Sequence, residues 1–109
     1  MLPKENRIRK TSEFNLVFKG SQRLETEHFK VYLHFANPTE EQISKLGIVT
    51  SAKVGNAVIR NKLRRQIKSI LKDRILGSTK PAWIVIMVKK AIGKLEYKDV
   101  QKELEIITI

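Results

Sequence analysis

The feature that most restricts the fold is the segment 82–90, AWIVIMVKK, which is apolar at nearly every position before its two lysines. Such a run predicts a central β-strand that is covered on both faces. The segment 28–36, HFKVYLHFA, alternates strictly instead, which predicts a half-buried strand. Its apolar face would carry Phe29, Val31, Leu33 and Phe35. The segment LGIVTSA at 46–52 predicts another strand, after a polar loop.

Three helices are predicted around these strands. The longest spans Asn56 to Leu76 and ends at Gly77, with one apolar face formed by Ile59, Leu63, Ile67, Ile70 and Leu71. A short helix over residues 13–19 is expected to be capped by Thr11 or Ser12 and to stop at a left-handed Gly20. A last helix is expected from residue 95 onward, and its buried stripe would be Tyr97, Val100, Leu104 and Ile107.

The order of these elements predicts the fold class. A chain of 109 residues forms one domain, 1–109, with a modest core. The order α-β-β-(β)-α-β-α indicates an α/β (α+β) two-layer sandwich with a single sheet. We expect the two strands that flank the long helix to be parallel neighbours joined by a crossover.

The charge of the chain points to a polyanionic partner. There are 22 Lys and Arg against 11 Asp and Glu, and the pI is about 10.1. This excess favours nucleic acid first and an anionic membrane surface second. Residues 1–10 indicate an extended basic arm. No long apolar run or signal-peptide pattern occurs, and cysteine is absent, so we expect a cytoplasmic protein without a spanning helix, disulfide or thiolate metal site.

The long helix concentrates this charge. From Lys53 to Arg74 there are eight basic residues and one acidic residue, Asp73. At 100° per residue the polar side of the helix carries Asn61, Arg64, Arg65, Lys68 and Lys72, with Arg60 at its border. A solvated helix face is the usual alternative, but such faces mix both signs of charge. The turn Val54-Gly55-Asn56 also places free amides at the positive end of the helix, where a phosphate can bind.

Aromatic residues supply a second indication. The polar face of the strand 28–36 presents Lys30, Tyr32 and His34, and such a mixture of ring and charge suits single-stranded nucleic acid. Tyr32 packed beneath a helix is an equal alternative. Phe14 and Phe18 share one helix face and belong either to the core or to a groove beside the sheet.

Catalytic groups are few. His28 and His34 have no recognised metal spacing, and the carboxylates Glu96, Asp99 and Glu103 are explained by a solvated helix face. No phosphate-binding loop, nucleophile elbow or dinucleotide fingerprint occurs. We therefore expect no catalytic residue and no metal site in this chain.

Several segments together resemble the bacterial ribonuclease P protein subunit. They are NRIRKTSEFNLVFKG, FKVYLHF, LGIVTSAK, KVGNAVIRNKLRRQIK, WIVIMVKK and LEYKDVQKEL, in that family's order and over nearly the whole chain. The resemblance implies a subunit of the ribonuclease P endonuclease that binds a catalytic RNA and assists 5′ maturation of precursor transfer RNA. It implies chemistry on the RNA with Mg²⁺, no cofactor on the protein, and a monomer in a 1:1 ribonucleoprotein. A ribosomal-type RNA-binding protein is the alternative, and a stand-alone nuclease would need an acidic cluster.

The resemblance also assigns residues. The family's Arg-rich motif falls on the polar side of the long helix, and with the turn before it the RNA-binding residues are Lys53, Asn56, Arg60, Asn61, Lys62, Arg64, Arg65 and Lys68. The family's leader-binding cleft would be lined by Phe14, Phe18 and Tyr32, together with Lys30. Ala52 stands where the family often has a lysine, so the phosphate role there rests on Lys53. A left-handed crossover is implied as well, against the usual rule.

Overall fold

A single mixed sheet organises the molecule. The computed structural model describes residues 3–20, 22–35, 43–50, 54–77, 81–89 and 96–107. Its elements are η1 (Lys4–Asn6), α1 (Thr11–Phe18), β1 (Gln22–Glu25), β2 (Phe29–Phe35), β3 (Lys45–Val49), α2 (Ala57–Leu76), β4 (Ala82–Val88) and α3 (Tyr97–Leu104). The strand order is β1-β2-β4-β3; β4 pairs antiparallel with β2 and parallel with β3. The predicted one-sheet α+β fold and the parallel pair around the long helix are confirmed.

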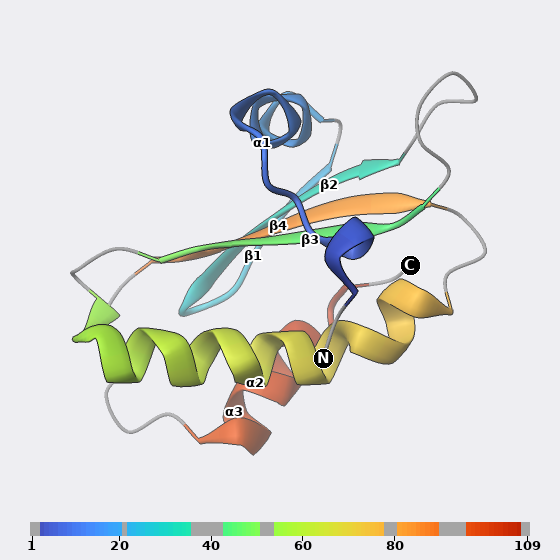
Figure 1. Ribbon diagram of the computed structural model, residues 1–109. Helices are drawn as coiled ribbons and strands as arrows, with labels where there is room; N and C mark the ends of the chain where they lie inside the picture. The colour runs from blue at the N-terminus through green and yellow to red at the C-terminus, as the bar shows by residue number, and fades with distance from the viewer. Residues whose placement is uncertain are drawn as a thin grey trace.

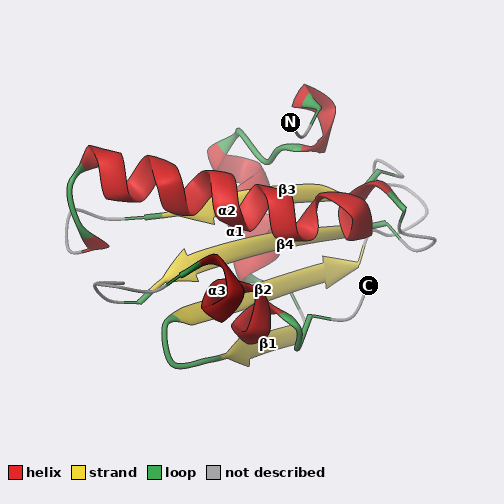
Figure 2. Ribbon diagram, turned by 90° about the horizontal axis from the view of Figure 1, so that it is seen from below, coloured by secondary structure: helices red, strands yellow, loops and turns green. Residues whose placement is uncertain are grey.

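The β3-α2-β4 crossover is left-handed. Figure 2 views the sheet from the side of α2, and there β3 and β4 both run from right to left. With α2 in front, the chain passes from β3 at the top to β4 below it. Nearly all parallel crossovers have the opposite hand. The hand that the family resemblance implied is therefore present.

Helices lie on both faces of the sheet. In Figure 1, α1 lies above the sheet, whereas α2 and α3 lie below it. The larger core is on the α2 side and includes Phe29, Val31, Leu33, Leu63, Ile67, Leu71, Ile84, Ile86, Val100 and Leu104. A smaller core beneath α1 contains Ile8, Val17, Trp83 and Val85. The strand β4 is buried on both faces, as predicted, except at the half-buried Met87.

The N-terminal segment packs against the sheet rather than extending as an arm. Arg7 forms a parallel bridge with Leu46 of β3, and the Ile8 amide donates to the Leu46 carbonyl at 3.0 Å. Ile8 is buried in the smaller core. This pairing covers the outer edge of β3 and fixes the position of the neighbouring basic side chains.

Two predictions about α1 are wrong. The helix begins at Thr11 with Lys10 as its N-cap, and the Glu13 carboxylate accepts from the Arg9 and Lys10 amides, so neither Thr11 nor Ser12 is the cap. Gly20 is not left-handed; positive φ within the described ranges occurs at Gly55 alone, at 152°. A Cβ at Gly20 would lie 2.7 Å from the Leu33 carbonyl oxygen, so close approach to β2 explains this glycine.

The predicted apolar faces of α2 and α3 are correct, except that one residue on each helix is exposed. Leu63, Ile67 and Leu71 are buried on α2, but Ile59 is 38% exposed because it folds over the backbone of Gly55. On α3, Val100 and Leu104 are buried together with the following Ile107. Tyr97 is 40% exposed instead, and its hydroxyl lies 3.2 Å from Ser69 Oγ of α2.

Candidate nucleic-acid interface

The polar side of α2 forms a cationic ridge, by which we mean Arg60, Asn61, Lys62, Arg64, Arg65 and Lys68. Asn61, Lys62 and Arg65 are exposed, and the other three are half-buried. Since Leu63, Ile67 and Leu71 dock onto the sheet, the ridge residues stay on the outer flank of the helix. Five of these residues lie on the polar side or border that the helical spacing predicted, and Lys62 is added by the family's Arg-rich motif.

Arg64 joins the ridge to the end of β3. Its guanidinium donates to Thr50 Oγ1 at 2.8 Å and to Asn61 Oδ1 at 3.4 Å. Thr50 directly follows the last residue of β3, so this arginine is held where strand and helix meet. The buried Arg60 Nε has no hydrogen-bond partner within the described part of the chain. An acceptor such as a phosphate oxygen would satisfy it.

The ridge gathers cations without anions between them. Burial lowers the pKa of Lys68, and the nearby charges of Arg7 and Arg64 lower it further. Arg7 therefore belongs electrostatically to the ridge, although the sequence pattern did not assign it. Its position depends on the pairing with Leu46, which no local periodicity reveals. A bound polyanion would relieve the repulsion among these three charges.

The turn before α2 is a helix cap in this structure. Asn56 is the N-cap, and its side-chain oxygen accepts from the Ile59 amide at 3.0 Å. The Asn56 oxygen is thus engaged within the protein, and its predicted contact with RNA would have to use other atoms. The predicted phosphate contact at Lys53 lies outside the described residues.

Three aromatic rings from two elements form an aromatic cluster of Phe14, Phe18 and Tyr32. The rings of Phe14 and Phe18 are 6.4 Å apart between centroids, and Phe18 meets Tyr32 edge-on at 5.0 Å. The Arg23 guanidinium lies 5.2 Å from the centre of the Tyr32 ring. All three rings are half-buried. They therefore pack beneath α1, and each retains a solvent-accessible part.

The sheet beside this cluster is incompletely covered. Strand pairing sets Lys30, Met87 and Val49 side by side, and alternation puts Lys30 on the same face as Tyr32. All three are half-buried, so part of each side chain is open to solvent, and we call these three residues the open strip. Met87 and Val49 were not predicted as site residues. A methionine within a strand of branched and aromatic residues was the only signal, because its flexible side chain suits an adaptable surface.

The open strip and the ridge adjoin each other. Val49 closes one end of the strip, and the next residue, Thr50, accepts the hydrogen bond from Arg64. A strand of nucleic acid that crosses the aromatic cluster would therefore reach the ridge after passing Val49 and Thr50. This adjacency unites the two surfaces that the sequence suggested separately.

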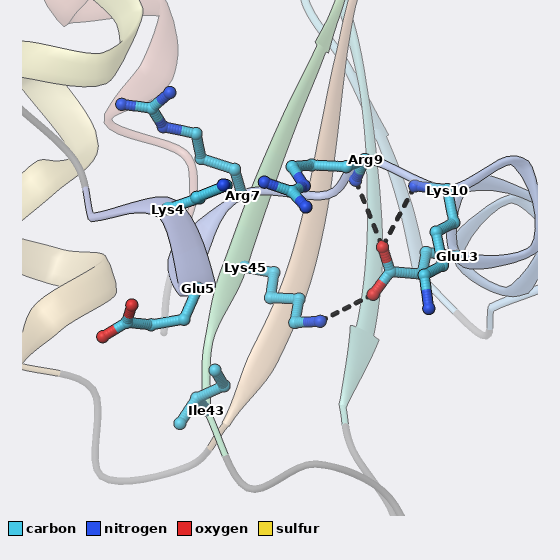
Figure 3. A pocket seen from close by; sticks show the side chains of 8 residues that line it. All are labelled: Lys4, Glu5, Arg7, Arg9, Lys10, Glu13, Ile43 and Lys45. Atoms are coloured by element: carbon cyan, nitrogen blue, oxygen red, sulfur yellow. Dashed lines mark hydrogen bonds and ion pairs between the residues drawn. The ribbon is translucent and has the colours of Figure 1, made fainter.

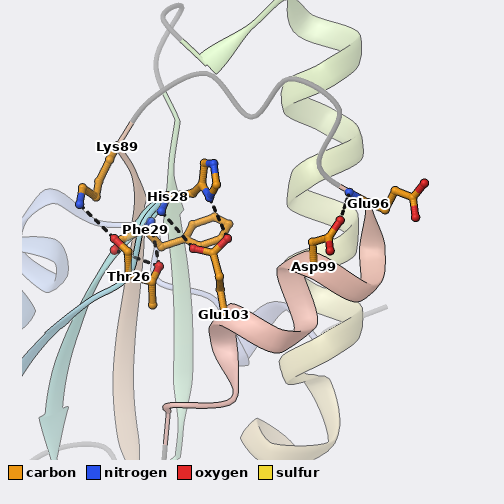
Figure 4. Close-up of polar contacts among 7 residues, drawn as sticks. All are labelled: Thr26, His28, Phe29, Lys89, Glu96, Asp99 and Glu103. Carbon is orange, nitrogen blue, oxygen red and sulfur yellow. Dashed lines mark hydrogen bonds and ion pairs between the residues drawn. The ribbon is translucent and has the colours of Figure 1, made fainter.

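The carboxylates of α3 have structural partners (Figure 4). Glu103 accepts from the His28 amide at 3.0 Å, and its other oxygen lies 2.8 Å from His28 Nδ1. Burial would raise the pKa of Glu103, but hydrogen bonds from Thr26 and His28 outweigh it and lower the pKa. Asp99 accepts from the Glu96 amide at 3.0 Å and caps the helix. Across the described ranges, no three histidine, aspartate or glutamate side chains are grouped to hold a metal ion.

Comparison with known proteins decides the family. The model of the family described as Ribonuclease P matches residues 2–108, and that is nearly the whole chain. The chain belongs to the ribonuclease P protein family. The ribonuclease P protein component of Bacillus velezensis is 30% identical over 104 residues, covering 95% of this chain and 87% of that protein. That of Mycoplasma capricolum is 36% identical over 97 residues, covering 87% and 85%.

Solved ribonuclease P proteins share the fold. A Staphylococcus aureus RNase P protein mutant with defective mRNA degradation activity is 31% identical, with a TM-score of 0.79 over 94% of this chain and 84% of that chain. The Thermotoga maritima RNase P protein is 29% identical, with a TM-score of 0.73 over 90% of each. The family places this chain in the ribonuclease P complex and in transfer-RNA processing, with an RNA partner. Nothing in these comparisons favours the ribosomal-type alternative.

The helices of this ribonuclease P protein do not have the character of membrane spans. Among the helices that the structure describes, none combines the length and the apolar composition needed to cross a bilayer.

Proposed function

We propose that this ribonuclease P protein binds the catalytic RNA through its ridge and the 5′ leader of precursor transfer RNA through its aromatic cluster. The observation that carries the proposal is the adjacency of the two surfaces at Thr50 and Arg64. One RNA can occupy the ridge while an unpaired strand crosses the neighbouring strip, so the protein holds substrate and ribozyme together.

The ridge suits phosphate groups. Arginine presents a planar fork of donors that matches two phosphate oxygens, and Arg60, Arg64 and Arg65 supply three such forks. Lys62 supplies a positive charge but lacks the planar set of donors that arginine has. Each phosphate contact releases counterions, so assembly on this surface depends strongly on salt.

The aromatic cluster suits unpaired bases. A base stacked on an aromatic side chain gains roughly 1–3 kcal/mol without regard to its identity. The aromatic rings and Lys30 of the open strip together offer stacking and charge to a single strand. A precursor has such a strand before its 5′ end and a mature transfer RNA does not. The aromatic cluster and the open strip would therefore distinguish the precursor, which is the substrate, from the mature transfer RNA, which is the product.

The proposed division of labour leaves hydrolysis to the RNA. Mg²⁺ bound by the RNA would activate the attacking water and stabilise the leaving group. The protein would contribute positive charge beside the RNA, where it lowers repulsion between phosphates and so favours close approach of the substrate. We expect a 1:1 complex of protein and RNA in the cytoplasm.

The ridge is tested with Lys62→Ala/Arg65→Ala, because both side chains are exposed and neither hydrogen-bonds within the described structure. Binding to ribonuclease P RNA should weaken, and the slope of log K against log salt should fall by about 1.4–1.8, since each lost phosphate contact removes 0.7–0.9. The measurement is a salt titration of binding. Lys98→Ala/Lys102→Ala is the control, since it removes equal charge from α3, which carries no ridge residue. Equal slopes for the two double variants would contradict the assignment of the ridge.

A further inference from the structure

A second basic surface lies beside α1, away from the open strip. The N-terminal segment, the start of α1 and the start of β3 enclose a depression of about 410 Å³ (Figure 3). Its basic lining residues are Lys4, Arg7, Arg9, Lys10 and Lys45. Two acidic residues, Glu5 and Glu13, also line it. Neither the Arg-rich motif nor the aromatic cluster includes any of these residues.

The floor of this depression is a buried ion pair. Lys45 Nζ donates to Glu13 Oε2 at 2.6 Å, and the two side chains are only 8% and 15% exposed. Glu13 Oε1 accepts from the Arg9 and Lys10 amides, at 3.1 Å each. The Lys45 ammonium also lies 4.8 Å from the centre of the Trp83 ring. The charge of Glu13 is thus compensated within the protein, and both of its carboxylate oxygens are engaged.

Because Glu13 is paired with Lys45, the rim of the depression is positively charged. With Glu13 and Lys45 neutralising each other, the exposed Lys4, Arg9 and Lys10 share the lining with one further acid, Glu5. Figure 3 shows the Arg9 and Lys10 amides bound to Glu13, so the backbone that carries both side chains is fixed while the side chains themselves reach solvent.

The size and position of the depression indicate its ligand. A volume of about 410 Å³ suits a small molecule or one nucleotide and is far too small for a duplex. Ile43, which is 37% exposed, offers an apolar wall against which a ribose or base can pack. Arg7 lies on the rim and close enough to Lys68 to repel its charge. Arg7 therefore links the depression electrostatically to the ridge.

We infer that this depression binds the phosphate of one unpaired nucleotide in the RNA that lies on the ridge, that is, in the catalytic RNA. The inference rests on the proposed function of the ridge and adds a second contact that orients the RNA across the N-terminal segment. The cluster of Lys4, Arg9 and Lys10 would hold the phosphate, and Ile43 would contact the sugar or base.

The test is Arg9→Ala/Lys10→Ala, because it keeps both backbone amides that bind Glu13. Binding to ribonuclease P RNA should weaken about tenfold, and the log–log salt slope should fall by about 1.4 for two contacts to an unpaired strand. The preference for precursor over mature transfer RNA in the assembled complex should not change. Lys98→Ala/Lys102→Ala again serves as the control with equal charge.

Three outcomes have distinct meanings. A slope and affinity equal to those of the α3 control would overturn the site, whereas a changed preference for precursor would show that the leader occupies it and would overturn the assignment to the catalytic RNA. If the unaltered protein fails to bind the RNA, the proposed function itself fails, so the two failures are separable. The chain has no cysteine, so Ile43→Cys can carry a photo-crosslinker as a second measurement. Crosslinking to an unpaired nucleotide of the catalytic RNA is expected, and crosslinking to the leader or to neither RNA would contradict the inference.

Discussion

At the scale of single residues, Tyr32 packs against its neighbours and keeps a solvent-accessible part for the binding role that we propose. Phe18 meets one edge of its ring, and Arg23 from the neighbouring strand lies directly opposite in register, with its guanidinium over the ring. Arginine stacks on bases as readily as on tyrosine. A base could therefore enter between Arg23 and Tyr32 without disturbing the contact with Phe18.

Tyr32→Ala should weaken binding of precursor transfer RNA by about tenfold while binding of mature transfer RNA stays nearly unchanged. The reason is the loss of one stacked base, worth roughly 1–3 kcal/mol. The measurement is the affinity of the assembled complex for each RNA. Tyr97→Ala, which removes the other tyrosine of the chain from α3, is the control and should leave both affinities unaltered. Parallel losses for the two RNAs would refute the role of the cluster.

Local patterns were sufficient for some site residues and not for others. Alternation along β2 placed Lys30 and Tyr32 on one face, and four-residue spacing placed Phe14 and Phe18 together. The open-strip residues Met87 and Val49 could not be predicted, because their exposure depends on how much of the sheet α1 covers.

At the scale of elements, α1 depends on tertiary contacts. A helix of eight residues is too short to be stable alone. It is held by the buried Val17 in its last turn and by Glu13 at its start, which binds Lys45 of β3. Because Phe14 and Phe18 belong to this helix, the Glu13–Lys45 pair also positions two of the three rings of the aromatic cluster.

Glu13→Gln should lower the free energy of unfolding by roughly 3–5 kcal/mol near pH 7, because it removes the carboxylate that pairs with the buried Lys45 ammonium. Burial would raise the pKa of Glu13, but hydrogen bonds from Lys45, Arg9 and Lys10 outweigh it and lower the pKa from 4.5 to about 2. A lowered pKa stabilises the fold above pH 4.5, and this contribution disappears as the pH falls from 4.5 toward 2. The difference between the two proteins should therefore shrink over that interval.

Urea unfolding at a series of pH values measures this difference. Glu105→Gln, at an exposed carboxylate after α3, is the matched control and should change stability little at any pH. A destabilisation by Glu13→Gln that is the same at pH 3 and pH 7 would show that the ion pair is not its cause.

Periodicity predicted the long elements, since α2 and β4 repeat their apolar residues over many positions. It did not predict the ends of α1. The cap comes from Glu13 reaching back to amides, and the glycine after the helix, Gly20, is explained by its close approach to a carbonyl of β2. Both features differ from the short polar N-cap and the left-handed glycine that local sequence patterns predict.

At the scale of the whole molecule, one mixed sheet keeps the proposed RNA-binding surfaces together. β3 lies at the sheet edge, with α2 on one face and α1 on the other, so the ridge, the open strip and the basic depression all border this strand. The parallel pairing of β3 with β4 was predictable from the long helix between them. The left hand of that crossover was not, because it breaks the general rule and only the family resemblance implied it.

The most direct measurement is 5′ processing of a precursor transfer RNA at low Mg²⁺, comparing the protein alone, a bacterial ribonuclease P RNA alone, and the two together. The account predicts efficient cleavage only in the mixture, because the protein supplies the positive charge and the leader contact that the RNA lacks at low Mg²⁺. Failure to stimulate a well-folded RNA, or cleavage by the protein alone, would contradict it.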